Sequence, residues 1–323
     1  MSNTDKMPHG RVKYSGKKWG NFSSSEAHWN FLNYWTALSE KTKMKIKLIA
    51  SDLDGTLLTD QKTLSPETVK TLRWAADKGI YLVPVTGRSY TAVPDFIKEF
   101  PGVEYVITSN GGAVYSAASG ERIYQRLLEP ESVEAAFKAP RPDNMAVEIF
   151  IEGRPYSEMS YVNDPKAYGA TEYGAEYVRR TRTPVEDLEN FAMENKDRLD
   201  SMAFVCADPA EREEFRLYLE NHVPDIYVTS SVSHLLEIGH KDAGKGNTLR
   251  YLMDYLGVHR EEAMAVGDGD NDVSMLWAVR YGIAVKNGTE ACRNAAVRVT
   301  GSNQEDGVAQ AVKLFAGYDQ KHR

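Results

Sequence analysis

Short apolar runs alternate with amphipathic segments over residues 44–128 and again over residues 240–323. The apolar runs have the length of buried strands, and the segments between them place apolar residues at helical spacing. Strands that alternate with helices in this way indicate a parallel sheet with crossover helices. The pattern therefore predicts an α/β fold with a Rossmann-like, doubly wound parallel-sheet core.

The helix expected at residues 65–79 has the clearest limits, because Ser65 is a good N-cap and Pro66 suits the first helical position. Gly79 then suits the helix stop. A hairpin is expected at residues 113–125, with a Ser-Gly turn. The other expected core strands are 46–53, 80–88, 104–112, 262–269, 281–285 and 297–300, and the other helices are 90–100, 246–257, 271–280, 288–296 and 307–317.

Residues 129–239 are more mixed, with strand candidates that follow one another and a helix between some of them. The strand candidates are 145–153, 201–207, 225–230 and 234–239, and the helix is 209–223. This change of pattern predicts an α+β cap domain, residues 129–239, inserted into a core built from residues 44–128 and 240–323.

The first 43 residues are polar, basic and rich in turn formers, and they lack the apolar region of a secretory signal. Trp29, Leu32, Trp35 and Leu38 stand at three-residue steps, which is compatible with a short amphipathic helix. We interpret residues 1–43 as a flexible N-terminal extension, or as sequence upstream of a start at Met44. A helix lying on a membrane surface is the alternative, but the segment has no lysine-rich stripe.

Composition narrows the classes of function. The chain has 323 residues, 42% of them hydrophobic, and a formal net charge of −7, which is typical of a globular protein and argues against nucleic-acid binding. No apolar run reaches the length of a membrane helix. The two cysteines, Cys206 and Cys292, form no CxxC pattern, so we expect a cytoplasmic protein without disulfides. The seven histidines show no zinc-binding spacing.

Four polar segments follow expected strands or precede an expected helix of the core: SDLDGT, VTGR, AGKGN and VGDGDND. Ligands of an open parallel sheet bind beyond the carboxyl ends of the strands, so these segments are expected to meet in one crevice. The crevice would then contain Asp52, Asp54, Asp268, Asp270, Asp272, Thr86, Lys245 and Asn271. Clustered carboxylates repel one another, and an oxygen-only ligand set suits Mg²⁺.

The spacing of Asp52 and Asp54 allows two roles, because residues two apart on an extended strand share a face while Leu53 points away. One carboxylate can act as a nucleophile beside the metal, and the other as a general acid and then base. Gly55 allows a sharp turn, which Thr56 can hold by a hydrogen bond. Thr86 and Lys245 are residue types that bind and neutralise a phosphoryl group.

Three other motifs do not fit these segments. A calcium-binding loop starting at Asp268 would need glycine where Val273 stands and glutamate where Val279 stands. AGKGNT has the wrong glycine spacing for a P-loop, and no Ser or Thr follows Lys245 directly. GDGDND is not a GxGxxG dinucleotide fingerprint.

With SDLDGTLL, VTGR, KGNTL and GDGDNDVSML in this order, the sequence resembles the haloacid dehalogenase-like (HAD) phosphatases, specifically the Cof-like subfamily with a type IIB cap. ITSNGGAVY and VTGSNQEDGVAQAV are also similar to this subfamily, and the resemblance covers nearly all of residues 44–318. It implies a phosphoric monoester hydrolase, while the N-terminal extension has no counterpart in the family pattern.

The resemblance also implies residue roles. Asp52 would attack phosphorus to form an aspartyl-phosphate, and Asp54 would protonate the leaving oxygen and then activate water. Asp272 would orient Lys245 or a metal-bound water, whereas Asp270 occupies a variable position. The implied Mg²⁺ ligands are the Asp52 side chain, the Asp54 carbonyl and Asp268, and the implied phosphate ligands are Thr86, Lys245, Asn271 and the backbone amides of Leu53 and Gly87.

The expected substrates are small phosphorylated metabolites, with sugar phosphates as the first class to test, because a large cap disfavours folded partners. Glu152, Arg154 and Tyr156 are candidates for leaving-group contacts, although the Arg of EGR also suits a hairpin turn. Two alternatives remain: a phosphomutase on the same scaffold, and a catalytically silent protein that binds phosphorylated ligands. Neither a nucleic acid nor a membrane is an expected partner, and the chain is expected to be a monomer or a homodimer.

Overall fold

The computed structural model describes residues 45–231 and 234–318. The extension expected at residues 1–43, with its candidate helix, lies outside the described residues. Within the described ranges, five parallel strands form one sheet in the order β14-β13-β12-β1-β2, which we call the core sheet. Its strands are β1 (Leu48–Ser51), β2 (Tyr81–Pro84), β12 (Ala263–Gly267), β13 (Tyr281–Val285) and β14 (Arg298–Thr300).

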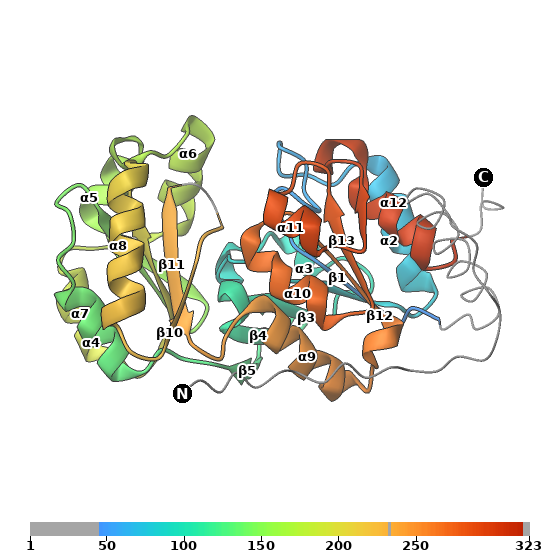
Figure 1. Cartoon of the computed structure of the whole chain (residues 1–323), viewed down its shortest axis with the longest axis horizontal. Coiled ribbons are helices and arrows are strands. Elements are labelled where there is room, and N and C mark those ends of the chain that lie inside the picture. The colour runs from blue at the N-terminus through green and yellow to red at the C-terminus, as the bar shows by residue number, and fades with distance from the viewer. Residues whose placement is uncertain (1–44, 232–233, 319–323) are drawn as a thin grey trace, which may run out of the picture. The chain divides into compact units, whose positions relative to one another are not determined.

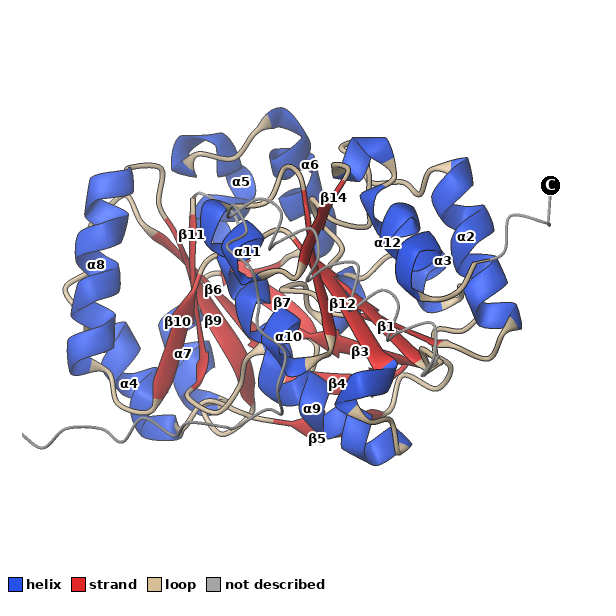
Figure 2. Ribbon diagram, turned by 45° about the vertical axis from the view of Figure 1, so that its right-hand side comes forward, coloured by secondary structure: helices blue, strands red, loops and turns tan. Residues whose placement is uncertain are grey.

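Helices cover both faces of the core sheet (Figures 1 and 2). Ile49 and Val266 face one apolar cluster, which includes residues of three helices: α2 (Pro66–Asp77), α3 (Asp95–Lys98) and α12 (Gly307–Phe315). Ala50 and Ala265 face a second cluster, with α9 (Lys245–Leu256), α10 (Val273–Ala278) and α11 (Glu290–Ala295). Apolar residues on both faces are what a parallel sheet with two helical layers requires, so the predicted doubly wound core is confirmed.

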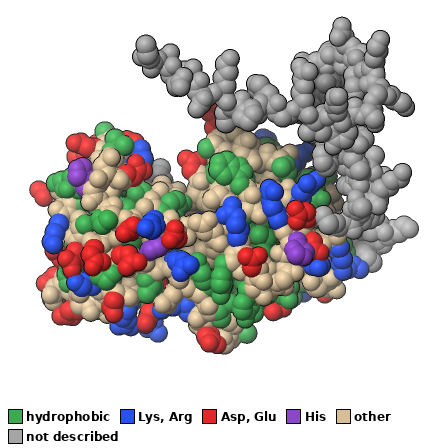
Figure 3. Space-filling view, turned by 60° about the horizontal axis from the view of Figure 1, so that its bottom comes forward, with side chains coloured by type: hydrophobic (Ala, Val, Ile, Leu, Met, Phe, Trp, Pro, Cys, Tyr) green, Lys and Arg blue, Asp and Glu red, His purple; other side chains and the backbone are tan. Residues whose placement is uncertain are grey.

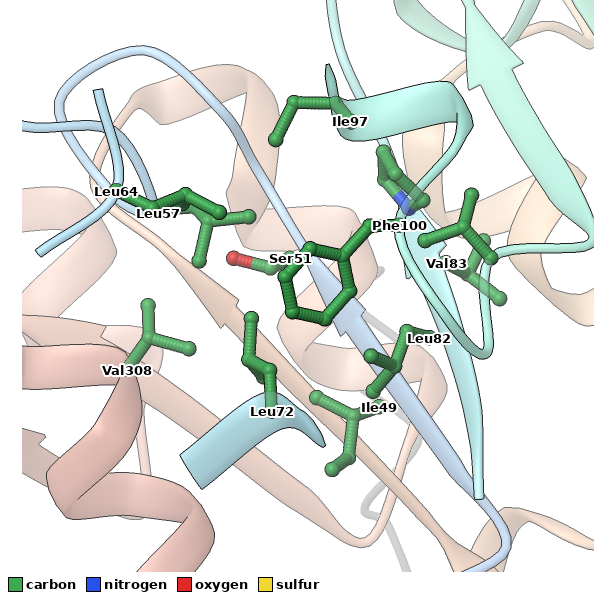
Figure 4. Close-up of a pocket in the computed structure, with 12 residues that line it drawn as sticks. Ile49, Ser51, Leu57, Leu64, Leu72, Leu82, Val83, Ile97, Phe100 and Val308 are labelled. Atoms are coloured by element: carbon green, nitrogen blue, oxygen red, sulfur yellow. The ribbon is translucent and has the colours of Figure 1, made fainter. Parts of the chain in front are cut away.

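A pocket between the core sheet and its helices belongs to the first cluster (Figure 4). Its lining is apolar except for Ser51, whose hydroxyl donates to the Asp52 carbonyl at 2.8 Å. Ile49, Leu72 and Val308 line it from β1, α2 and α12. With no charged side chain in its lining, this pocket is part of the packing of the core.

Two predictions for the first half of the core are wrong in detail. The helix expected at residues 90–100 is divided at Pro94 into a 3₁₀ turn, Tyr90–Ala92, and the short α3, because proline and its predecessor disfavour a continuous helix. β3 (Tyr105–Thr108) meets the core sheet by one parallel bridge, Val85 to Ile107. It pairs instead with β4 (Ala113–Ser116) in an antiparallel sheet that β5 (Arg122–Gln125) completes as the predicted hairpin.

A second large sheet, which we call the cap sheet, contains six strands among the described residues, in the order β10-β11-β9-β6-β7-β8. The sequence predicted four of these strands and missed two short ones, β7 and β8. The strands are β6 (Ala146–Ile151), β7 (Arg154–Glu158), β8 (Thr183–Val185), β9 (Leu199–Val205), β10 (Ile226–Thr229) and β11 (Leu235–His240). The pairs of this sheet are antiparallel except for β7 with β8, which is parallel, and helices lie between its strands in the chain, which confirms the predicted α+β cap.

Alternate residues of the cap sheet face different surroundings. Leu236 and Ile238 face an apolar cluster that also holds residues of α4 (Pro130–Lys138), α7 (Leu188–Glu194) and α8 (Pro209–His222). On the opposite face, Ala146 and Val205 pack with Tyr161 of α5 (Met159–Asn163) and Val178 of α6 (Glu172–Thr181). Buried polar residues also lie on that face, among them Glu148, Ser201 and Glu237.

Core and cap residues are joined by hydrogen bonds around Asp200 of β9, which is 0% exposed. Arg122 of β5 donates to Asp200 Oδ1 at 2.8 Å, and the Gly153 amide donates to Oδ2 at 2.6 Å. The Gly153 carbonyl accepts from the amide and hydroxyl of Thr91, both at 3.0 Å. A carboxylate from the cap and a guanidinium from the core therefore form a buried ion pair.

No helix in the described ranges has the length and apolar character needed to span a bilayer. On the face drawn in Figure 3, acidic and basic side chains are interspersed.

Burial raises the pKa of Asp200 to about 6, against the Gly153 and Arg122 donors that lower it. A raised pKa in the folded state means that stability is lost as pH rises from the unfolded value toward 6. We therefore expect the free energy of unfolding of the wild type, relative to Asp200→Asn, to fall by about 2 kcal/mol between pH 4 and pH 7. Urea denaturation at each pH measures this difference.

Asp95→Asn is the matched control, because it removes an exposed carboxyl from α3. Its stability relative to the wild type should change little over the same pH range. A pH-independent difference between the wild type and Asp200→Asn would contradict the assigned cause.

Candidate active site

The ends of β1 and β12 bring two acidic segments together. These neighbouring strands are parallel, with Ser51 opposite Val266, and the Asp52 amide donates to the Val266 carbonyl at 3.0 Å. Asp52 and Asp268 therefore follow adjacent strand ends, although 216 positions separate them in the chain. This convergence is the one that the sequence predicted from four separate segments.

Lys245, the first residue of α9, lies between two carboxylates. Its Nζ atom is 2.6 Å from Asp52 Oδ1 and 2.6 Å from Asp272 Oδ1, and the residue is 1% exposed. Burial alone would lower the lysine pKa, but the two carboxylates outweigh it and raise the pKa above its usual range. The ammonium is therefore held charged.

For Asp52, burial outweighs the attraction of the neighbouring ammonium. Burial raises the pKa of Asp52 well above its usual value, and the neighbouring charges of Asp272 and Asp268 add to this rise, while Lys245 opposes it. Burial, followed by the Asp272 charge, raises the pKa of Asp268 to about 6. The single ammonium of Lys245 therefore offsets only part of the cost of burying these carboxylates.

Asp52, Asp268 and Asp272, which we call the acidic triad, each offer a carboxylate oxygen within 4.8 Å of the others. Such a set suits a hard divalent cation, which would lower the raised pKa values of its ligands. Asp272 Oδ2 accepts from the amides of Asp268 and Gly269, both at 2.9 Å, and its Oδ1 accepts from Lys245. With both oxygens in use, Asp272 is better placed to orient Lys245 than to bind a metal directly.

The Asp54 carboxylate lies in a different environment. Arg88 binds it with two N–H groups, at 2.6 and 2.7 Å, and Lys62 lies at 2.8 Å. Burial raises the pKa of Asp54, but Arg88 and Lys62 outweigh it and lower the pKa to about 2. Asp54 is therefore ionised at neutral pH, and it can accept and pass on a proton only if this clamp loosens.

Neither cation of this clamp was among the site residues that the sequence motifs predicted. Arg88 directly follows the predicted pair Thr86 and Gly87, so its place in the VTGR segment was the available signal. Lys62 carries no such signal, because it lies in a turn with φ of 59° and reaches Asp54 only through the folded loop. The Arg88 guanidinium also lies 5.1 Å from the ring centroid of Tyr177 in α6, which links the clamp to the cap.

The remaining predicted phosphate ligands lie around the same strand ends. Thr86 follows β2, is 1% exposed, and its hydroxyl oxygen accepts from the Arg88 amide at 3.1 Å. Asn271 is 5% exposed and donates through Nδ2 to Asn110 Oδ1 at 3.0 Å. Leu53 is fully buried in the first core cluster, but β1 ends at Ser51 and Leu53 lies in a turn, so the strand alternation expected for Asp52 and Asp54 is wrong. Gly87 lies close to the Asn110 side chain.

The structure corrects the expectation for Thr56. Its hydroxyl donates to Asp268 Oδ1 at 2.5 Å, so it links the first acidic segment to the last instead of holding its own turn. Asp270 is exposed and accepts from the Thr289 hydroxyl at 2.6 Å, in agreement with its supporting position.

The candidate leaving-group residues of the cap have other partners. Glu152 is paired with Arg198 at 2.7 Å, and the Tyr156 ring packs against Phe191 at a centroid distance of 5.0 Å. Arg154 is exposed at the start of β7, after the turn that Glu152 and Gly153 form with positive φ. The hairpin-turn reading of EGR is the one that the structure supports.

Comparison with known proteins agrees with this geometry. The model of the haloacid dehalogenase-like hydrolases matches residues 49–312, and the chain belongs to this family. A phosphatase of Bacillus subtilis is 29% identical over 289 residues, which cover 83% of this chain and 99% of that protein. A 5-amino-6-(5-phospho-D-ribitylamino)uracil phosphatase of the same organism is 29% identical over 275 residues, covering 83% and 97%.

Solved structures give the same result. A haloacid dehalogenase-like hydrolase from Bacteroides thetaiotaomicron has a TM-score of 0.68 at 29% identity, covering 84% of this chain and 99% of that one. One from B. subtilis has a TM-score of 0.70 at 27% identity, covering 83% and 99%. The resemblance to Cof-like phosphatases is confirmed, and the enzyme is a phosphoric monoester hydrolase.

Gly55 provides a test of the acidic triad. It has φ of +84°, and a Cβ atom there would lie 2.5 Å from Asp268 Oδ2. Gly55→Ala should therefore displace the Asp268 carboxylate and weaken the binding of a divalent cation, measured by calorimetry with Mg²⁺, at least about tenfold.

Gly79→Ala is a matched control, because Gly79 has φ of +71° but open space around its Cβ position. Both variants should lose about 1 kcal/mol of stability from left-handed backbone strain, but only Gly55→Ala should lose cation affinity. Equal Mg²⁺ affinity in the two variants would show that the cation does not depend on Asp268.

Proposed function

We propose that the enzyme is a Mg²⁺-dependent phosphatase that hydrolyses small phosphorylated metabolites through an aspartyl-phosphate on Asp52. The observation that carries this proposal is the charge of the buried site. Three carboxylates lie close together and one ammonium contacts two of them, so the fully ionised cluster has two negative charges in excess. A divalent cation balances that excess, and it also offsets the repulsion between Asp52 and an anionic phosphate.

The metal ligands in this proposal are the Asp52 carboxylate, the Asp54 backbone carbonyl and Asp268. All are oxygen donors, which Mg²⁺ prefers. Asp272 orients Lys245 through the contact at 2.6 Å. When bound, Mg²⁺ would supply positive charge beside the transferring phosphoryl group.

The phosphoryl group is held by Thr86, Lys245, Asn271 and the backbone amides of Leu53 and Gly87. A carboxylate oxygen of Asp52 attacks phosphorus, the bond from phosphorus to the leaving oxygen breaks, and Asp54 gives its proton to that oxygen. Asp54 then takes a proton from water, whose oxygen attacks the phosphorus of the aspartyl-phosphate and releases phosphate and free Asp52. Because Arg88 and Lys62 hold Asp54 ionised, substrate binding or cap movement must first loosen this clamp, and Asp54 must take up a proton from solvent before it protonates the leaving oxygen.

We further propose the division into a core of residues 44–128 and 240–323 and a cap of residues 129–239, with residues 1–43 as an extension. A cap that closes over the crevice admits small substrates and excludes bulk water. Relatives that are named as phosphatases of a phosphorylated ribityl compound support polyol and sugar phosphates as the first class to test. The two free, buried cysteines support a reducing, cytoplasmic location.

A screen of phosphorylated metabolites tests the function directly. With Mg²⁺ present, we expect release of inorganic phosphate, with the highest kcat/KM for sugar or polyol phosphates. EDTA should abolish turnover and excess Mg²⁺ should restore it, because the acidic triad repels the substrate without a cation. Formation of a phosphosugar isomer without phosphate release would establish a mutase, and binding of vanadate without turnover on any compound would establish a silent binding protein.

Asp52→Asn should lower kcat by at least about 10⁴-fold, because the amide is a poor nucleophile and cannot form the acyl-phosphate. Asp270→Asn is the matched control, since Asp270 lies in the same acidic segment but is exposed and bonded to Thr289. Its kcat should stay within about threefold of the wild type. A folded Asp52→Asn enzyme with more than a few per cent of wild-type turnover would refute the nucleophile.

A further inference from the structure

Three buried side chains form a continuous hydrogen-bond chain from the proposed phosphate site to the cap sheet. Asn271 Nδ2 donates to Asn110 Oδ1 at 3.0 Å, and Asn110 Nδ2 donates to Glu237 Oε1 at 3.0 Å. The residues are 5%, 7% and 7% exposed, respectively. The first two belong to the core, whereas Glu237 belongs to β11 of the cap sheet. None of the roles proposed above uses Asn110 or Glu237.

Glu237, at the cap end of this hydrogen-bond chain, determines which side-chain atoms donate and which accept along it. Burial raises the pKa of Glu237, but both of its carboxylate oxygens accept hydrogen bonds, as those of an ionised carboxylate do. Oε2 accepts from the Ser231 amide at 2.8 Å. Because Glu237 needs a donor at Oε1 as well, the Asn110 side chain must turn its nitrogen toward Glu237. Its oxygen then faces Asn271, which must in turn present an N–H group. One hydrogen of the Asn271 amide is used in this way, and the other is left for a phosphate oxygen.

The backbone at Asn110 has an unfavourable conformation that its surrounding contacts maintain. Ser109 and Asn110 are non-glycine residues with φ of 50° and 51°. A left-handed conformation at such residues costs free energy and persists only where surrounding contacts impose it. Those contacts are the Asn110 amide to the Thr86 carbonyl at 3.1 Å and the Ser109 amide to the Arg88 carbonyl at 2.9 Å.

Gly87 lies beside the same chain. A Cβ atom at Gly87 would be 3.1 Å from Asn110 Oδ1 and 3.2 Å from Glu237 Oε1. The chain therefore passes next to a backbone amide that is also proposed to bind phosphate. Two members of the proposed phosphate-binding set therefore lie beside Asn110: Gly87, and Asn271 through its hydrogen bond.

We propose that Glu237 is a positioning residue that, through Asn110, fixes the direction of the Asn271 amide for binding phosphate. This inference rests on the proposed role of Asn271 as a phosphate ligand. Because Glu237 comes from the cap sheet, whereas Asn110 and Asn271 come from the core, the placement of the cap and the affinity for phosphate are coupled. Whatever moves β11 away from Asn110 weakens phosphate binding, and bound phosphate favours the cap position seen here.

A purely electrostatic role for Glu237 predicts the opposite effect of its substitution on phosphate binding, so one experiment distinguishes the two roles. A carboxylate near a phosphate site repels the anion, so its neutral replacement should strengthen phosphate binding if charge were its main contribution. Glu237→Gln keeps the shape but can present either oxygen or nitrogen to Asn110. If the direction of the amide chain is the main contribution, this variant should bind phosphate more weakly.

The experiment measures inhibition by inorganic phosphate and by vanadate, with 4-nitrophenyl phosphate as substrate. For Glu237→Gln we expect inhibition constants and KM about five- to twentyfold higher than in the wild type, with kcat within about threefold. Asn110→Gly, in which glycine tolerates the left-handed backbone, should show a similar loss. The double variant should be no worse than Asn110→Gly, because both substitutions break one chain.

Ser132→Ala is the control for general damage to the cap. Ser132 of α4 is 0% exposed and donates to the Pro224 carbonyl at 2.7 Å, within the cap. This variant should lose stability without changing the inhibition constants. Unchanged or tighter phosphate binding in Glu237→Gln, or additive losses in the double variant, would overturn the proposal. A wild-type enzyme with neither turnover nor phosphate inhibition would instead overturn the proposed function.

Discussion

Repulsion among buried carboxylates is the constraint on which the rest of the site depends. Asp52, Asp268 and Asp272 lie within 4.8 Å of one another through their oxygens, and Lys245 supplies one positive charge between two of them. Burial raises the pKa of Asp52 and of Asp268, which shows that it is costly to keep these carboxylates ionised side by side. A divalent cation bound to them would lower that cost and complete the charge balance that the protein leaves open.

The topology of the core explains how such a cluster forms. β1 and β12 are neighbours in a parallel sheet, so their carboxyl ends coincide although the whole cap sheet is inserted between them in the chain. Apolar clusters on both faces fix this register, because a slip of one residue would turn Ile49 and Ala50 to the wrong sides. The carboxylates are thus held by the packing of the core, and the cap strands contribute contacts such as those of Glu237 and Asp200.

Regular periodicity and strand-end motifs made much of this fold predictable. The core strands, the helix at residues 66–77 and the acidic segments follow from local patterns that long-range packing did not override. The short β7 and β8 were missed because β7 opens with Arg-Pro and β8 is Thr-Pro-Val, and neither gives an alternating apolar pattern. Pro94 broke a predicted helix that its neighbours alone would have favoured.

Contacts between distant segments could not be predicted in the same way. The positions of Asp52 and Asp268 follow from strand ends and that of Lys245 from the start of a helix, but the clamp of Arg88 and Lys62 on Asp54 depends on how two loops fold over the site. The Asn271–Asn110–Glu237 chain depends on the orientation of amides in three separate segments. Single asparagines and glutamates in a sequence give no sign of such partners, because their residue types are common on any surface.

Anomalous diffraction from crystals soaked in Mn²⁺ tests the central claim most directly. The account predicts one strong peak at coordination distance, within about 2.5 Å of an oxygen of Asp52, an oxygen of Asp268 and the Asp54 carbonyl oxygen. A peak bound elsewhere, with Asp52 still held only by Lys245, would contradict it.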